Sequence, residues 1–197
     1  MQYVYPTSPL QYLAAVVGGL LFGVAVIAKR LSTPKSVGAT SARSGLSIVG
    51  ITIKGASFFI AAAAPVEFSP DHFGKSLILA VVVLCLGVAG ALLFHRSAKA
   101  LGDNWSLIAR TRSEHELVRN GPFARMRHPI YLSMLLLLAA LGLGLGHVWG
   151  LIAAVPVFLL GTIIRIREEE RLLHQQFGEE YARYASETPA FIPRLRP

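Results

Sequence analysis

The stretch HELVRNGPFARMRHPIY, residues 115–131, separates two strongly apolar regions of the chain with a short polar segment. It contains two of the six histidines, and it places the pairs Gly121-Pro122 and His128-Pro129 close together. Pro129 suits the first turn of a helix, because its missing N–H has no partner there in any case. A polar, irregular segment that leads directly into a long apolar run indicates a binding site at the start of a helix.

The composition of the whole chain indicates an integral membrane protein. Hydrophobic residues make up 53% of the 197 residues, charged residues only 15%, and the mean hydropathy is +0.54. Soluble domains carry about 25% charged residues, so this chain has too little polar surface to cover a soluble globule. The net charge of +8 could indicate a nucleic-acid partner, but in a membrane chain we first attribute it to the loops, where Lys and Arg set the topology and meet anionic lipid head groups. We therefore expect membrane lipids as partners, and no nucleic acid.

Apolar runs predict an all-α fold with five transmembrane helices. The fourth and fifth spans form a hairpin over residues 130–164, and three spans precede it near residues 10–28, 46–64 and 76–94. Each run is close to the ~20 residues that cross a bilayer. The chain then divides into an N-terminal membrane region, residues 1–100, and a second region, residues 101–197. The second region consists of a polar segment (101–129), the hairpin, and a C-terminal helix with its tail (165–197).

The basic residues predict the orientation of these spans. Of the 19 Lys and Arg residues, 17 fall in residues 29–45, 95–129 and 165–197. Five spans place these three segments on one side of the membrane, and the positive-inside rule makes that side cytoplasmic. We therefore expect a multi-pass protein with an exterior N-terminus, a cytoplasmic C-terminus, and a cytoplasmic pocket between the polar segment and the C-terminal helix.

Lys54 is an exception to this distribution, because it lies near the middle of the second span. A charge at that depth is costly, which makes Lys54 a candidate functional residue. The alternative is that its side chain reaches a polar surface and has no chemical role. The single cysteine, Cys85, allows no cysteine-based metal site, and the histidines show no metal-ligand spacing. We expect no bound metal.

The C-terminal helix begins with charged residues on one face. Arg165 and Glu169 are four residues apart, so they lie together where the fifth span leaves the membrane, on the same side as His128 and Tyr131. A stripe of apolar and aromatic residues follows within a segment predicted to be helical to about residue 185: Leu173, Phe177, Tyr181 and Tyr184.

Simpler roles stay open for single residues of the polar segment. Arg125 and Arg127 can supply positive-inside charge. His128 can be a helix cap, and Tyr131 can be an interfacial aromatic residue. Their clustering favours a functional site over these separate roles.

Two motifs together resemble the isoprenylcysteine carboxyl methyltransferase family of integral membrane enzymes. The first is GPFARMRHPIY, residues 121–131, and the second is R-x-x-x-E-E-x-x-L-x-x-x-F-G-x-E-Y-x-x-Y, residues 165–184. The resemblance covers about residues 101–193. Phospholipid N-methyltransferases and some membrane sterol reductases have related C-terminal halves, so the motifs specify the superfamily more closely than the substrate.

This resemblance implies an S-adenosylmethionine-dependent methyltransferase that acts on the carboxylate of an isoprenylcysteine-like, lipophilic substrate. It makes residues 101–197 the catalytic region and residues 101–129 its cofactor segment. It implies catalytic roles for Arg165, Glu169 and Glu170, with Arg165 facing the substrate carboxylate. The implied cofactor-binding residues are His115, Glu116, Leu117, Val118, Phe123, His128, Pro129, Ile130, Tyr131 and Glu169. The family pattern has a tyrosine in place of Phe123, so one hydroxyl contact is lost here.

Three alternatives differ in chemistry. A carboxylate acceptor is already ionised at pH 7 and needs no general base, whereas a phospholipid amine must lose a proton, with Glu170 or Tyr131 as candidate bases. A membrane reductase would bind NADPH in a related pocket. A non-enzymatic scaffold would have no use for the paired polar motifs.

Overall fold

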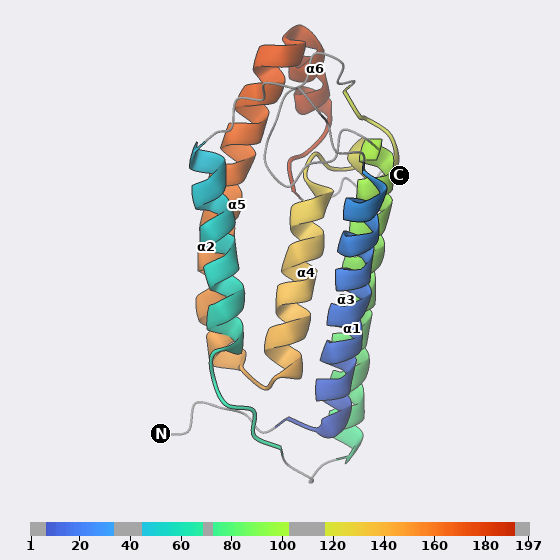
Figure 1. The fold of residues 1–197 in the computed structure, drawn as a ribbon, viewed down its shortest axis with the longest axis vertical. Helices are drawn as coiled ribbons and strands as arrows, with labels where there is room; N and C mark the ends of the chain where they lie inside the picture. The colour runs from blue at the N-terminus through green and yellow to red at the C-terminus, as the bar shows by residue number, and fades with distance from the viewer. Residues whose placement is uncertain (1–6, 34–44, 69–72, 103–116, 192–197) are drawn as a thin grey trace.

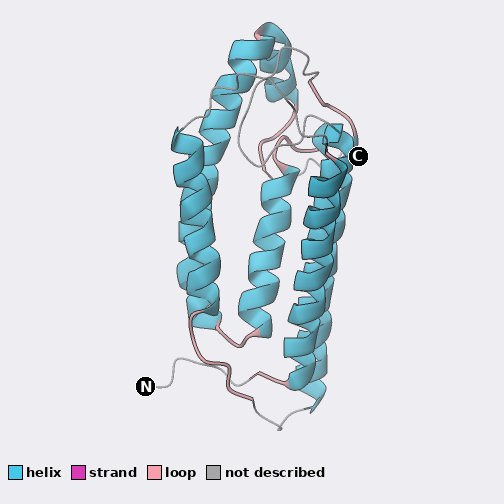
Figure 2. Ribbon diagram, viewed as in Figure 1, coloured by secondary structure: helices cyan, strands magenta, loops and turns pink. Residues whose placement is uncertain are grey.

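The computed structural model describes residues 7–33, 45–68, 73–102 and 117–191. Over these residues the chain consists of helices and loops (Figure 2), with one isolated bridge between Thr7 and Phe68. The helices are α1 (Pro9–Ser32), α2 (Gly45–Ala62), α3 (Phe73–Leu101), the 3₁₀ helix η2 (Gly121–Ala124), α4 (Pro129–Gly144), α5 (Val148–Phe177) and α6 (Glu179–Glu187). The predicted all-α architecture is therefore confirmed for the described residues.

Four of these helices, α1, α2, α3 and α5, are long and apolar enough to cross a membrane. They correspond to the predicted first, second, third and fifth spans. α4 coincides with the predicted fourth span and is apolar, but it has only 16 residues. A straight helix needs about 20 residues to cross the hydrocarbon core of a bilayer. The structure thus supports a multi-pass membrane protein, while a crossing by α4 and the five-span topology stay predictions.

α4 occupies the centre of the helix bundle (Figure 1). α1 and α3 pack side by side on one flank, α2 and α5 pack together on the other, and α4 contacts both pairs. α5 extends beyond α2 at the end of the bundle where α4 begins, and α6 folds against this extension. The start of α2, the start of α4 and the outer part of α5 therefore meet at one end of the molecule.

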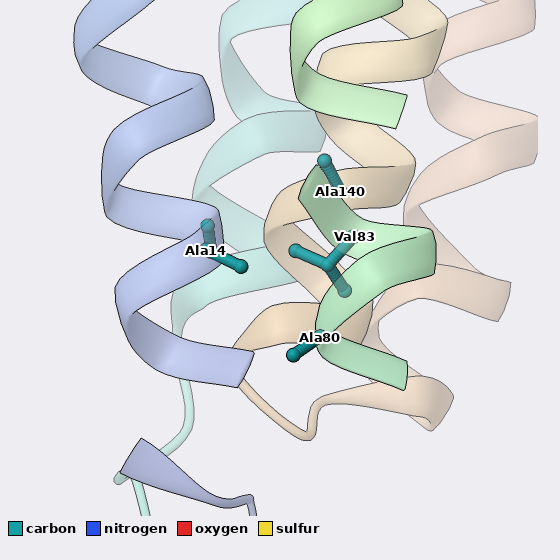
Figure 3. Packing of buried hydrophobic residues seen from close by; sticks show 5 residues of the cluster. Ala14, Ala80, Val83 and Ala140 are labelled. Atoms are coloured by element: carbon teal, nitrogen blue, oxygen red, sulfur yellow. The ribbon is translucent and has the colours of Figure 1, made fainter. Parts of the chain in front are cut away.

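Small side chains form the core between α1, α3 and α4. One buried cluster of such residues joins the three helices (Figure 3) and includes Ala14, Ala80, Val83 and Ala140. α1 and α3 also cross closely at Gly18, where an added Cβ would lie 2.9 Å from the Cα of Gly87. Such small-residue interfaces let helices approach closely enough for van der Waals packing, a main attraction between helices in lipid.

α5 continues well beyond residue 164, where the fifth span was predicted to end. Its polar outer part is rich in Glu, Arg and Leu, which are strong helix formers, so the helix persists to Phe177. It stops at Gly178, whose φ of +49° is a conformation that favours glycine. The segment predicted to be helical to about residue 185 is therefore helical, but it forms two helices with a break at Gly178. The aromatic stripe is divided, with Tyr181 and Tyr184 buried on the separate helix α6.

Candidate active site

Tyr131 links the start of α4 to the outer half of α5. Pro129 occupies the first turn of α4, as its sequence position predicted, and Tyr131 follows within the same turn. The Tyr131 side chain is buried, and its hydroxyl donates a hydrogen bond to Oε1 of Glu169. The same hydroxyl oxygen accepts a hydrogen bond from Nε of Arg165 at 3.0 Å. One phenol thus joins a cation and a carboxylate from another helix.

Arg165 lies at the centre of this group and is only 4% exposed. Its Nη2 donates to Oε1 of Glu169 at 2.6 Å, which is the predicted pairing across one helical turn. Its Nη1 donates to the hydroxyl of Ser47 at the start of α2. With the bond to Tyr131, three helices hold one guanidinium in a fixed orientation.

A second ionic group surrounds Glu170. Its Oε1 lies 2.9 Å from Nε2 of His128 and accepts a hydrogen bond from Nε of Arg127, also at 2.9 Å. The other ring nitrogen of His128, Nδ1, lies 3.8 Å from Oε2 of Glu169. His128 therefore connects the two adjacent carboxylates of α5. His128 does occupy the N-cap position of α4, but its side chain makes no capping hydrogen bond there and contacts the two carboxylates instead.

Arg127 also binds the segment that follows α6. Its Nη1 donates to the carbonyl oxygens of Ala185 and Thr188, at 2.6 and 2.7 Å. The backbone N–H groups of Arg127 and His128 donate to the carbonyls of Pro189 and Ala190, at 2.9 and 3.0 Å. These contacts hold the C-terminal segment beside the start of α4. Arg127 is therefore more than a topology-setting charge, which was the simpler alternative.

Phe123 is buried on η2 and faces α6 through its backbone. Its carbonyl oxygen accepts a hydrogen bond from the hydroxyl of Tyr184 at 2.7 Å. Burial raises the pKa of Tyr184 to about 12, so this hydroxyl stays protonated and donates at neutral pH. α6 thereby fixes η2, the part of the polar segment that leads into α4.

α2 adds Lys54 to the site, which the sequence left open. Lys54 is buried, and its Nζ lies 4.0 Å from the centroid of the Tyr131 ring. Two glycines allow α2 and α5 to approach this closely. A Cβ on Gly50 would lie 2.7 Å from Cγ of Arg165, and one on Gly161 would lie 3.0 Å from the backbone N of Lys54.

The structure brings together five of the predicted site residues and leaves their chemical roles as predictions. These five are His128, Tyr131, Arg165, Glu169 and Glu170. Of the other implied cofactor contacts, Pro129 is buried, Leu117, Val118 and Ile130 are half-buried, and His115 and Glu116 lie outside the described residues. In the described parts of the chain, no three His, Cys, Asp or Glu residues come together as a metal site.

Fold and site together define a multi-pass membrane protein with a buried ionic cluster at one end of an apolar helix bundle. The sequence matches the model of the family described as phospholipid methyltransferase over residues 76–180, more than half of the chain. The chain therefore belongs to this family of membrane methyltransferases. The isoprenylcysteine methyltransferase resemblance is confirmed at the level of the family.

Three curated relatives match the chain over part of its length. It is 36% identical over 119 residues to the cobalt-zinc-cadmium resistance protein CzcN of Cupriavidus metallidurans, which covers 58% of this chain and 50% of the relative. It is 30% identical over 118 residues to the nickel-cobalt-cadmium resistance protein NccN of Alcaligenes xylosoxydans xylosoxydans (59% and 53%). It is 30% identical over 112 residues to protein-S-isoprenylcysteine O-methyltransferase B of Arabidopsis thaliana (56% and 57%). The chain thus spans about half the length of the curated relatives it matches.

Proposed function

We propose that this chain transfers a methyl group from S-adenosylmethionine to the carboxylate of a lipophilic acid that resembles an isoprenylcysteine. The reaction would take place on the cytoplasmic side, where the basic segments are expected to lie. The observation that carries the proposal is the position of Arg165. Its buried guanidinium lies where the apolar helix bundle meets the polar outer part of α5. Tyr131, Glu169 and Ser47 fix its orientation.

Arg165 is suited to bind a carboxylate that arrives from the apolar side. A guanidinium has five N–H donors in a rigid, planar arrangement, and its three contacts with Tyr131, Glu169 and Ser47 use three of them. One N–H on each terminal nitrogen is left for a ligand, and arginine binds carboxylates in a planar, bidentate geometry that lysine lacks. Because the acceptor is already ionised, the protein needs to orient it and exclude water, and it needs no general base.

The residues around Glu170 fit the polar part of the cofactor. S-adenosylmethionine supplies an electrophilic methyl group, and its amino-acid part carries an ammonium and a carboxylate. Charged and hydrogen-bonding groups that complement this part of the cofactor gather at the start of α4: Arg127, His128, Glu169 and Glu170. We assign His128 and Glu169 to the cofactor, together with the implied contacts in residues 115–131.

An amine acceptor is the main alternative, because the family model is described as phospholipid methyltransferase. That chemistry requires a base to remove a proton from the ammonium. Glu170 already pairs with Arg127 and lies 2.9 Å from His128, while Tyr131 and Glu169 both bind Arg165. Glu170 is thus paired with a cation, and the Tyr131 hydroxyl already donates its proton to Glu169, so neither candidate base is free to accept a proton from an ammonium. This arrangement favours a carboxylate acceptor.

Cofactor binding tests the class of reaction. The protein, purified in detergent, is titrated with S-adenosylhomocysteine and separately with NADPH, and heat release is measured by calorimetry. We expect saturable binding of S-adenosylhomocysteine and none of NADPH. Binding of NADPH without binding of S-adenosylhomocysteine would replace the methyltransferase proposal with the reductase alternative.

A further inference from the structure

We propose that Lys54 of α2 is an acceptor-binding residue that acts with Arg165 to select substrates with a carboxylate head group. The inference rests on the function proposed above and extends it to a part of the chain that the family match does not cover. That match begins at residue 76, after α2 has ended. The first two spans would then supply acceptor specificity to a catalytic region that begins later in the sequence.

Lys54 is built into the site. The buried residues of α2 recur every three or four positions and form one face that packs on α5: Ser47, Gly50, Lys54, Ser57 and Ala61. Ser47 accepts a hydrogen bond from Arg165, and Lys54 lies two turns further along the same face. Lys54 is only 4% exposed and does not reach an aqueous surface.

The charges of the described site residues leave one cation unmatched. Arg165 pairs with Glu169 and Arg127 pairs with Glu170, whereas no described carboxylate lies within 4.0 Å of the Lys54 ammonium. The Tyr131 ring offers a cation–π contact, which compensates part of the cost of burial. A buried ammonium without an anionic partner is costly. A ligand that brings a negative charge would balance the charge of Lys54.

The position of Lys54 along α5 points to the acceptor and away from the cofactor. Its backbone packs against Gly161, which lies one turn before Arg165 in the apolar part of α5. The proposed cofactor contacts lie further along the bundle: Glu169 is one turn beyond Arg165 in α5, and His128 lies at the start of α4. In the same turn as Gly161, Thr162 is 2% exposed, and its hydroxyl has no hydrogen-bond partner among the described residues. A lipophilic acid that enters from the apolar side would meet these groups first.

Binding of a matched pair of ligands tests this inference without requiring turnover. The full-length protein in lipid nanodiscs, saturated with S-adenosylhomocysteine, is titrated with N-acetyl-S-farnesylcysteine and with its neutral carboxamide. We expect wild-type protein to bind the acid at least about tenfold more tightly than the carboxamide. Lys54→Met keeps most of the length of the side chain and removes the charge. It should lower the affinity for the acid at least about tenfold and change the affinity for the carboxamide less than about twofold. Lys54→Arg should retain most of the preference.

Three results would overturn the inference. The first is that wild-type protein binds the acid and the carboxamide equally. The second is that Lys54→Met leaves the preference for the acid intact. The third is that Lys54→Met weakens the binding of S-adenosylhomocysteine or of phosphatidylethanolamine and leaves the binding of the acid unchanged. If Lys54→Met does not fold, Lys54→Gln takes its place, because it also removes the charge: loss of the preference for the acid would support the inference, and an intact preference would overturn it.

The two proposals can fail separately. Acid binding that depends on Lys54, in the absence of any methyl transfer, would keep the inference and remove the proposed function. Methyl ester formation by an unimpaired Lys54→Met variant would keep the function and remove the inference.

Discussion

The hydroxyl oxygen of Tyr131 lies 3.0 Å from Nε of Arg165, so a residue at the start of α4 fixes the guanidinium of a residue in α5. The two residues are 34 positions apart in the chain. The turn between α4 and α5 reverses the chain and returns α5 to the end of the bundle where α4 began. This contact joins the two helices that carry the candidate site.

Removing the Tyr131 hydroxyl should impair both stability and turnover. Tyr131→Phe leaves the Nε donor of Arg165 without its buried partner and removes one of the two hydrogen bonds to Oε1 of Glu169, which costs about 1–3 kcal/mol of unfolding free energy. Thermal unfolding in detergent and turnover with a lipophilic acid measure the two effects. Tyr12→Phe is the matched control, because Tyr12 is exposed and packs edge-on against Phe68. Equal behaviour of the two variants would contradict the role of Tyr131.

Arg165→Ala should abolish turnover on a carboxylate acceptor while largely sparing the cofactor. The variant removes the only proposed bidentate contact with the acceptor, so we expect kcat/KM to fall at least about 100-fold. Affinity for S-adenosylhomocysteine should change less than about threefold, within ~1 kcal/mol. Arg167→Ala, an exposed arginine on the same helix, is the control. Intact turnover by Arg165→Ala would remove this residue from its assigned role.

Glu169→Ala should weaken the binding of the cofactor. Glu169 is the carboxylate that lies near both His128 and Arg165, and we assign it to the cofactor. Its loss should lower the affinity for S-adenosylhomocysteine at least about tenfold, as is typical when a charged hydrogen-bonding partner is removed. Calorimetric titration measures this affinity, with the exposed Glu179→Ala as the control. An unchanged affinity would show that Glu169 does not bind the cofactor.

The close approach of α2 and α5 at Gly50 predicts a pair of opposite results. Gly50→Ala would place a methyl group 2.7 Å from Cγ of Arg165 and 2.9 Å from the carbonyl oxygen of Gly161. We expect it to destabilise the protein by about 1–3 kcal/mol and to reduce turnover, because Arg165 must shift. Gly55→Ala, in the same helix, meets nothing within 4 Å and should be neutral or stabilising by up to ~1 kcal/mol. Thermal unfolding of both variants decides, and an equal response would reject close packing at Gly50.

The helices could be predicted from sequence because long apolar runs have few other structures available to them. The continuation of helix beyond residue 164 was predicted as well, but its division into α5 and α6 after Phe177 was not. The end of α5 at Gly178 depends on a backbone conformation that a glycine allows but does not require.

The candidate site was predictable where its residues lie close in sequence. Arg165 and Glu169 pair as their spacing indicated, near Tyr131, because the predicted hairpin returns α5 to the start of α4. Contacts between distant segments had no such signal. Ser47 is a small polar residue without a motif, and the carbonyl groups that hold Arg127 exist at every residue. A lysine in the middle of an apolar span is rare, so the sequence identified Lys54 as a candidate. It did not identify Tyr131 as the residue that Lys54 contacts.

The central claim is that an acid, and not an amine, receives the methyl group. The most direct measurement incubates the purified protein in nanodiscs with S-adenosylmethionine labelled in its methyl group, and with N-acetyl-S-farnesylcysteine or phosphatidylethanolamine as acceptor. Alkali releases labelled methanol from a methyl ester but leaves an N-methyl group intact. We predict alkali-labile label on the acid, lost in Arg165→Ala. Alkali-stable label on phosphatidylethanolamine, with none on the acid, would contradict the account.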